Sequence, residues 1–403
     1  MSATTAAVRA ELAQKARAFP VGAYRAGGGA ALLVGALVLL WGFAGGHEAR
    51  VWQAWHFNLL FWMGLAQASV IFAATQKLAK GHWSGVVIRF AEAAVAFTPV
   101  ALVLFLAEYL GRGHIYPWIH EPRPEVGGWL APQWFFLRDG AIIAVQAWLA
   151  WRFVRRDVAP DVKELASGTP ADRTEDKDRI SRDAAIFLLV WAFGASLLGF
   201  DLVMSLAHKW VSNLYGAFYF MGSFLAALMA LAVTAIALRR PMGLGELYSQ
   251  KQQHDLGKLC FGFTVFWAYL MWAQFLVIWY GNLPEETYFI FYRLWGPWKP
   301  VGVAVFLLVF LIPFLGLLGV KPKQFTPTML GFALTSLVGV WLERYLEVVP
   351  SINGGAGPAI GLPEVGVTCF FGGLFLLAVA WFAGRYPMLS PRLAADALER
   401  EHQ

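Results

Sequence analysis

Long apolar runs separated by short polar segments dominate the chain. A helix that crosses a bilayer needs roughly 20 mainly apolar residues. Ten runs of this kind occur, at 27–46, 52–75, 86–110, 133–154, 184–207, 213–238, 257–281, 300–320, 327–348 and 364–384. The fourth run opens with Arg138 and Asp139 and the ninth contains Glu343 and Arg344, so these two match least well. The pattern predicts an all-α membrane protein with ten transmembrane helices.

The composition supports a membrane protein and excludes several soluble classes. Hydrophobic residues make up 58% of the 403 residues, charged residues make up 14%, and the mean hydropathy is +0.55. Soluble domains are typically about 45–50% apolar and about 25% charged. One aqueous core cannot bury this much apolar surface. A disordered chain, a nucleic-acid-binding protein and an ordinary cytosolic enzyme are therefore excluded, and the lipid bilayer is an expected partner.

Basic residues are distributed unevenly between the connecting segments. If the N-terminus is cytoplasmic, 23 Lys and Arg residues fall in cytoplasmic segments and six fall in outer loops. Short cytoplasmic loops of membrane proteins are enriched in Lys and Arg, so we expect both termini to be cytoplasmic. The first 25 residues contain four basic residues and lead to no small-residue cleavage site, so we expect no cleavable signal peptide.

The spans predict four segments along the chain. These are a cytoplasmic N-terminal segment (1–26), spans one to five with a charged cytoplasmic loop at 155–183 (27–212), spans six to ten (213–384) and a cytoplasmic tail (385–403). The second span contains FNLLFWMG and the sixth contains LYGAFYFMG, each at the start of an outside-to-inside helix. Spans two to five and six to nine are therefore candidates for two copies of one unit.

Polar side chains inside the predicted spans fall at different depths. Those near the outer ends of spans are His56, Asn58, Glu108, Arg138, Asp139, Asp201, His208, Asn213, Tyr215, Glu343, Arg344 and Glu347. Arg89 and Glu92 lie near the inner end of the third span, three residues apart and so on one helix face. Those closer to the middle are Gln67, Gln146 and Gln274. Ionisable groups are costly to bury in a membrane, which makes each a candidate functional residue.

Two interpretations of these groups are open. In the first, a carboxylate in a dry site exchanges protons near neutral pH. The predicted proton path is then Arg89, Glu92, Glu108, Asp139, Asp201 and His208, and the candidates for quinone contact are His56, Asp201 and Tyr215. Asp201 lies two helical turns, or about 10 Å, from His208 and has no basic residue within one turn. In the second interpretation, Arg89–Glu92, Arg138–Asp139 and Glu343–Arg344 are structural charge pairs.

Cofactor-binding motifs are absent from the sequence. Cys260 and Cys369 lie in apolar runs without a neighbouring cysteine, which excludes a c-type haem attachment, a cysteine-ligated iron–sulfur cluster and a disulfide framework within the chain. A b-type haem needs two histidines at matching depth, and only His56 and His208 come close. No phosphate loop or zinc motif occurs in a suitable context. We therefore expect no metal, no catalytic residue and no bound redox cofactor in this chain.

The most distinctive segment of the sequence is an aromatic stretch at 267–289, WAYLMWAQFLVIWYGNLPEETYF. It predicts a helix with an aromatic girdle that ends at Gly281 and Asn282 before Pro284. Glu285 and Glu286 would follow in an acidic outer loop. This end of the helix is either a plain membrane-interface belt or a docking rim for a periplasmic partner.

Three segments together carry a family resemblance. The aromatic stretch, FDLVMSLAHKWVSNLYGAFYFMGS (200–223) and HIYPWIHEP (114–122) resemble the F subunit of alternative complex III. That complex is a bacterial quinol:cytochrome c (or blue-copper protein) oxidoreductase. More distant relatives are the NrfD-like membrane subunits of polysulfide reductase. The ten-span layout extends the resemblance over essentially the whole chain, although the family often has a proline near position 208, where this chain reads Ala207-His208-Lys209.

The resemblance implies an architecture and a set of partners. It implies two four-helix bundles (spans two to five and six to nine) flanked by spans one and ten, in the bacterial cytoplasmic (inner) membrane. The implied partners are a sister NrfD-like membrane subunit, an iron–sulfur subunit and multihaem and monohaem c-type cytochromes. Menaquinol or ubiquinol would be oxidised in the complex, and this subunit would mainly carry protons without a cofactor of its own. The alternatives are a structural anchor for peripheral electron-transfer subunits and a stand-alone secondary transporter.

Overall fold

All regular structure in the described part of the chain is helical. The computed structural model describes residues 11–81, 83–169, 174–208, 210–245, 247–353, 356–391 and 393. Eight helical stretches in these residues are long and apolar enough to cross a membrane: Glu11–Ala44, Glu48–Leu78, Ile88–Ile115, Lys177–Leu206, Tyr215–Arg239, Gln250–Gly281, Gly296–Leu317 and Leu362–Ala383. The prediction of an all-α, multi-span membrane protein is confirmed. Most of the predicted N-terminal segment and C-terminal tail, at 1–10 and 394–403, lies outside the described residues.

Two further long helices match the fourth and ninth predicted runs but are not among these eight. They are α6 (Pro132–Ser167) and α14 (Thr326–Asn353). Both helices contain charged side chains that are buried inside the molecule, such as Asp139 in α6 and Arg344 in α14. Charged side chains lower the mean hydropathy of a helix although they face its neighbours, so hydropathy alone does not decide whether these two helices cross the membrane.

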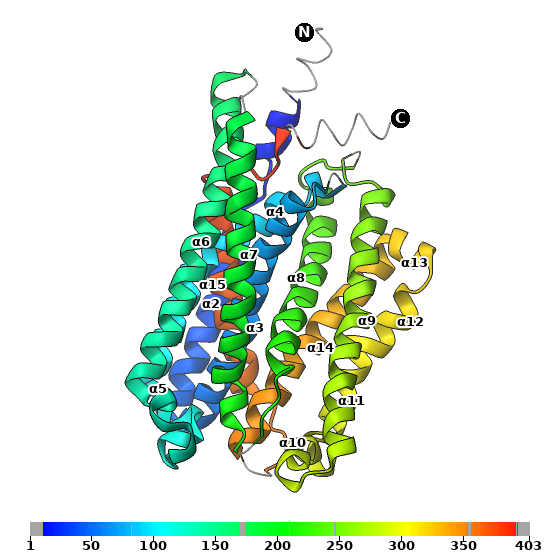
Figure 1. Ribbon diagram of the computed structural model, residues 1–403. Coiled ribbons are helices and arrows are strands. Elements are labelled where there is room, and N and C mark those ends of the chain that lie inside the picture. The colour runs from blue at the N-terminus through cyan, green and yellow to red at the C-terminus, as the bar shows by residue number, and fades with distance from the viewer. Residues whose placement is uncertain are drawn as a thin grey trace.

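The prediction of an irregular linker at 155–183 is wrong for its described residues, and its cytoplasmic location stays a prediction. Most of it is helical, because α6 continues to Ser167 and α7 (Thr174–Leu202) begins soon after it. Residues 170–173 lie outside the described residues. Figure 1 shows these two helices extending beyond the others as a helical hairpin. Ion pairs accommodate the charge here, since Asp183 is 2.6 Å from Arg152 and also pairs with Arg156.

The helix α3 (Glu48–Leu78) lies at the centre of the molecule and is almost fully buried. It packs against α5, α7, α8, α14 and α15, while α8 packs against α7, α9 and α14. Further elements of the chain are α2 (Val21–Ala44), η1 (Trp83–Gly85), η3 (Pro117–Ile119), η4 (Pro124–Leu130), η5 (Met204–Leu206), α8 (Tyr215–Arg239), η6 (Gly296–Trp298), α13 (Val320–Gln324) and α15 (Leu362–Ala383). The two segments with similar sequence, in α3 and α8, lie side by side, and the Tyr219 hydroxyl donates to the Leu60 carbonyl at 3.3 Å.

The two ends of the helix assembly differ in what they carry (Figure 1). At one end lie the connection between α6 and α7, the start of α2 and the end of α15. We call it the hairpin end. At the other end lie the short helices η3, η4 and α10 (Pro284–Leu294), and we call it the α10 end.

Two predicted spans are interrupted in the structure. The third is divided into α4 (Ile88–Ala93), the 3₁₀ segment η2 (Ala94–Phe97) and α5 (Thr98–Ile115). The eighth is divided into α11 (Lys299–Val305), the π-helical segment η7 (Phe306–Leu311) and α12 (Ile312–Leu317). A proline, Pro99 or Pro313, follows each irregular segment. Proline cannot donate the usual backbone hydrogen bond, so the helix changes its bonding pattern just before it.

The distinctive aromatic helix ends where the sequence predicts. α9 (Gln250–Gly281) is capped by Asn282, which has a left-handed backbone conformation (φ 46°). The acidic outer loop predicted after it is wrong, because Pro284 begins the helix α10. Glu285 and Glu286 lie in its first turn, where the partial positive charge of a helix N-terminus favours acidic side chains.

Close packing between α2 and α15 depends on glycine. A Cβ atom at Gly35 would lie 2.4 Å from the backbone nitrogen of Phe370, a contact that only backbone movement can relieve. We therefore expect Gly35→Ala to push the two helices apart and to destabilise the protein by about 1–3 kcal/mol. Thermal unfolding of the purified protein in detergent measures the effect. Gly29→Ala in the same helix is the control, because nothing lies within 4 Å of its Cβ position. Equal melting temperatures in the two variants would contradict this packing.

Candidate functional site

One arginine bridges two carboxylates near the α10 end of α6 and α7. Arg138 Nε donates to Asp139 Oδ1 at 3.1 Å, and Arg138 Nη2 donates to Asp201 Oδ2 at 2.8 Å. The Trp129 indole N–H donates to the other oxygen of Asp201 at 2.8 Å. No basic residue lies within one turn of Asp201 on its own helix, and its cation, Arg138, comes from α6. Two buried carboxylates share one cation, so this group is neutral when it also holds a proton.

A histidine–carboxylate pair lies between α3 and α5 at the same end. His56 Nδ1 lies 3.0 and 3.1 Å from the two carboxylate oxygens of Glu108, and His56 Nε2 lies 2.8 Å from the Leu202 carbonyl. The Tyr116 hydroxyl donates to Glu108 at 3.1 Å. A carbonyl only accepts, so Nε2 must carry a hydrogen. The Nδ1–Glu108 contact then requires either an imidazolium or a protonated carboxyl group. The pair therefore shares one proton, and both side chains are fully buried.

Two glutamine side chains, from α3 and α6, lie nearer the middle of these helices. Gln67 Nε2 of α3 donates to Gln146 Oε1 of α6 at 3.1 Å. Gln146 Nε2 in turn donates to the Trp191 carbonyl of α7 at 3.3 Å. Both glutamines are buried. Three helices are thus joined by polar contacts at a depth where apolar packing is the ordinary choice.

A third group of charges is buried toward the hairpin end. Arg89 pairs with Glu92 on its own helix, lies 2.9 Å from Asp157 of α6 and also pairs with Asp161 of α6. Lys77 of α3 reaches Asp157 at 2.7 Å. Arg89, Glu92 and Asp161 are fully buried. Among the described residues three carboxylates face two cations, so these five side chains are together neutral when they hold one proton.

These groups form a ladder along α3. His56, Gln67 and Lys77 are ten or eleven residues apart on this helix, which corresponds to steps of about 15 Å. The steps are longer than a hydrogen bond, so a proton crosses them only through water molecules or side-chain motion. The ladder begins near the α10 end, passes the glutamine pair and ends at the hairpin end.

A separate buried group lies between α8, α9 and α14. Arg344 Nη1 is 2.6 Å from Glu347, and Arg344 Nη2 is 4.0 Å from Glu343 and donates to the Tyr219 carbonyl at 2.9 Å. The Trp267 indole donates to Glu343 at 2.7 Å. The predicted Glu343–Arg344 pair is thus present and has a second acid. In the described residues this group has no counterpart to the Gln67–Gln146 step toward the hairpin end.

The structure does not bring all the predicted site residues together. His208 is exposed in the connection between α7 and α8, because α7 already ends at Leu202. The prediction that it shares a helix face with Asp201 is therefore wrong. Tyr215 is buried and interacts with Glu347, so it belongs with the Arg344 group. The three candidates for quinone contact lie in different groups: His56 beside Glu108, Asp201 beside Arg138, and Tyr215 in the other half of the molecule.

Several residues of the ladder were missed at the sequence level. Asp157 and Asp161 complete the Arg89 group, although both fall in the segment predicted as a loop. Their four-residue spacing was the available signal, because it places two acids on one helix face. Lys77 and Tyr116 are not among the predicted site residues, because their contacts with Asp157 and Glu108 are visible only in three dimensions.

Among the described residues no group of three or more His, Cys, Asp or Glu side chains could hold a metal ion. Both ring nitrogens of His56 are engaged, by Glu108 and by the Leu202 carbonyl, which leaves neither for a haem iron.

No protein-family model matches the chain, and a search of curated proteins also gives no match.

The glutamine pair allows its structural and functional roles to be separated. Gln146→Leu should destabilise the protein by about 1–3 kcal/mol, because it leaves the buried Gln67 amide without its partner. The double variant Gln67→Leu/Gln146→Leu should recover most of this loss, since both polar groups are then removed. Thermal unfolding of the three proteins measures this. A double variant less stable than Gln146→Leu would contradict a direct hydrogen bond between the two amides.

Proposed function

We propose that the chain is a ten-span membrane subunit with a proton path through its first half. α6 and α14 would be the two remaining spans. At 36 and 28 residues, they are about 54 and 42 Å long, more than a bilayer core of about 30 Å. α3 to α7 and α8 to α14 would form two four-helix bundles flanked by α2 and α15. The hairpin end would be cytoplasmic, in agreement with its Lys and Arg content.

The proposed proton path would serve quinol oxidation by a larger complex. We infer that the chain serves a bacterial quinol:cytochrome c (or blue-copper protein) oxidoreductase of the alternative complex III type. The resemblance of the segments at 200–223 and 267–289 supports this. The complex would include the sister membrane subunit, the iron–sulfur subunit and the c-type cytochromes, with menaquinol or ubiquinol as the electron donor. This chain would supply the proton route and no redox cofactor.

The observation that carries the proposal is the ladder of buried polar groups along α3, with buried acids near both of its ends. The Arg138 group and the His56–Glu108 pair lie near one aqueous side, and the Arg89 group lies near the other. The Arg138 group and the His56–Glu108 pair each hold one proton at neutral charge, and the Arg89 group contains three buried carboxylates that can take up a proton. A group that is neutral with one proton and charged without it can take up and release that proton.

A structural anchor remains a second candidate for a specific reason. Every acid of the ladder contacts a cation or a histidine, and buried charge pairs also occur in proteins that move no protons. An anchor needs these charge pairs only to hold the helices together, and its function does not require proton exchange. Variants that keep the fold but cannot bind a proton therefore separate the two functions.

Purification of the tagged full chain from its native membrane tests the assignment to the complex. We expect it to copurify with c-type haem, seen in reduced-minus-oxidised absorption spectra, and with quinol:cytochrome c reductase activity. A chain that purifies without haem, with no reductase activity and with substrate uptake in liposomes would contradict the proposal and favour a transporter.

A further inference from the structure

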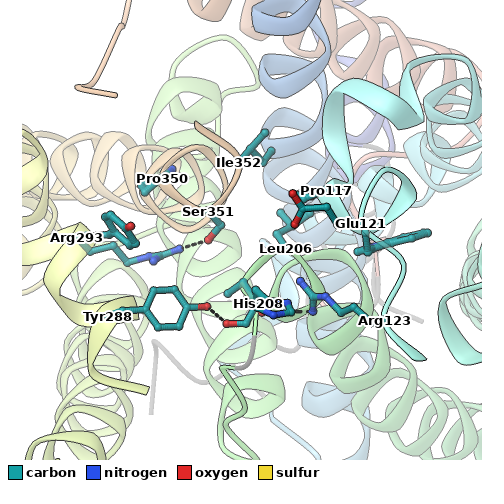
Figure 2. Close-up of a pocket in the computed structure, with 13 residues that line it drawn as sticks. Pro117, Glu121, Arg123, Leu206, His208, Tyr288, Arg293, Pro350, Ser351 and Ile352 are labelled. Atoms are coloured by element: carbon teal, nitrogen blue, oxygen red, sulfur yellow. Dashed lines mark hydrogen bonds between the residues drawn. The ribbon is translucent and has the colours of Figure 1, made fainter. Parts of the chain in front are cut away.

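A cavity at the α10 end contains an unusual buried cation. The cavity has a volume of about 280 Å³. Its walls come from both halves of the molecule: the η3 loop, the connection between α7 and α8, the helix α10 and the end of α14. Figure 2 shows Arg293 and Arg123 on opposite sides of this space, with His208 between them.

Arg293 is buried without a carboxylate partner. It is 6% exposed, and its guanidinium donates to the carbonyls of Phe289 and Glu347 and to the Ser351 hydroxyl, at 2.7–3.0 Å. Its Nε has no hydrogen-bond partner. Burial lowers the pKa of Arg293 to about 10, so the group keeps its charge at neutral pH. All its hydrogen-bond acceptors are neutral, so the Glu347 carboxylate attracts this charge electrostatically without a direct ion pair.

A second arginine adds to the positive charge of the cavity. Arg123 is half-buried and donates a long hydrogen bond, 3.5 Å, to the Ala207 carbonyl. Burial lowers its pKa as well. Glu121 also lines the cavity, but its side chain is exposed. With two arginines and one glutamate, the lining has a net charge of about +1 at neutral pH.

An apolar groove adjoins this cavity. The groove is lined by α10 and η6, with Phe291, Trp295 and Trp298 among its residues, and it shares Tyr288 and Tyr292 with the cationic cavity. Trp295 and Phe291 are more than half exposed. A cationic pocket that opens beside an aromatic groove matches a molecule with an anionic head and an apolar tail.

We propose that this cavity binds the phosphate group of an anionic phospholipid, with its acyl chains along the α10 groove. The two arginines would contact the phosphate oxygens, since the planar guanidinium suits that geometry. The site lies at the α10 end. With the hairpin end cytoplasmic, as proposed, this end lies at the outer surface of the membrane, where lipid headgroups are found. A lipid held there would join the α5–α6 loop to α10 and α14, and so bridge the two halves of the subunit.

Binding of defined lipids to the delipidated full chain tests this proposal. Native mass spectrometry of the chain in a neutral detergent would be recorded with phosphatidylglycerol, with phosphatidylcholine and with inorganic phosphate. We expect phosphatidylglycerol to bind more tightly than phosphatidylcholine. Arg293→Gln and Arg123→Gln should each weaken phosphatidylglycerol binding by about tenfold, as for the loss of one charge-assisted contact worth about 1.4 kcal/mol. Lys299→Gln, an exposed cation at the same end, should bind like the wild type.

The two arginine variants keep the test informative if one of them fails to fold. Arg123 is half-buried, so Arg123→Gln should retain the fold even if Arg293→Gln does not. Phosphate that binds as tightly as the lipid, with the same loss in both variants, would support an anion site but overturn a lipid as its occupant. Phosphatidylglycerol binding that neither substitution changes would overturn the site. These outcomes do not depend on proton conduction or on quinol oxidation.

Discussion

Replacing Arg89 by methionine should destabilise the protein by about 3–5 kcal/mol, because it removes the guanidinium that pairs with Glu92, Asp157 and Asp161 in a buried site. The cost arises mainly from desolvated carboxylates that lose their compensating charge. Thermal unfolding of the purified chain in detergent, followed by helical circular dichroism, measures it. We expect the largest fall in melting temperature of any single substitution discussed here.

The control for this prediction is Lys163→Met, which removes an exposed cation from the same part of α6. Surface substitutions of this kind usually change stability by less than about 0.5 kcal/mol. Arg89→Met combined with Glu92→Gln should recover part of the lost stability, because one uncompensated carboxylate is removed. Equal melting temperatures for Arg89→Met and Lys163→Met would mean that Arg89 does not neutralise these acids.

Glu92→Gln and Asp201→Asn should each slow quinol:cytochrome c turnover by tenfold or more, which is about 1.4 kcal/mol of barrier. An amide keeps the size and much of the hydrogen bonding of the carboxyl group but cannot take up a proton. Each substitution also equalises the number of acids and cations in its group, so the fold should be retained. Turnover of the assembled complex, corrected for its haem content, measures the effect.

A matched control for the turnover experiment is Glu125→Gln. Glu125 is an exposed acid in η4 near the α10 end, and its replacement should leave turnover unchanged. If Glu92→Gln and Asp201→Asn assemble normally and turn over at the wild-type rate, the buried acids are structural. The subunit would then be an anchor for its partners.

The sequence allowed the all-helical class to be predicted, together with the two apolar runs that match a membrane span least well. The eight apolar helices match eight of the ten predicted runs, and the other two are the runs that begin or end with charged residues. Asn282 and Pro284 allowed the end of α9 to be placed correctly, because left-handed caps and proline stops are local signals. Hydropathy did not predict the helices at the end of α6 and the start of α7. Both segments are rich in charged residues, as a loop would be.

The partners of the buried charges could not be predicted because they come from distant parts of the chain. Arg138 and Asp201 are 63 residues apart, and Arg89 and Asp161 are 72 residues apart. Only pairs on one helix, such as Arg89 and Glu92, have a spacing that the sequence reveals. The early end of α7 at Leu202 also separated His208 from Asp201, although a continuous helix was the simplest prediction.

Proton flux through the purified full chain in liposomes tests the central claim, a proton path along α3, most directly. A potassium-diffusion potential would drive protons inward, and a trapped pH dye would report their entry. We predict that the wild type conducts protons at least tenfold faster than Glu92→Gln, and also faster than the Gln67→Leu/Gln146→Leu variant despite its recovered stability. Identical flux in wild type, variants and protein-free liposomes would contradict the account.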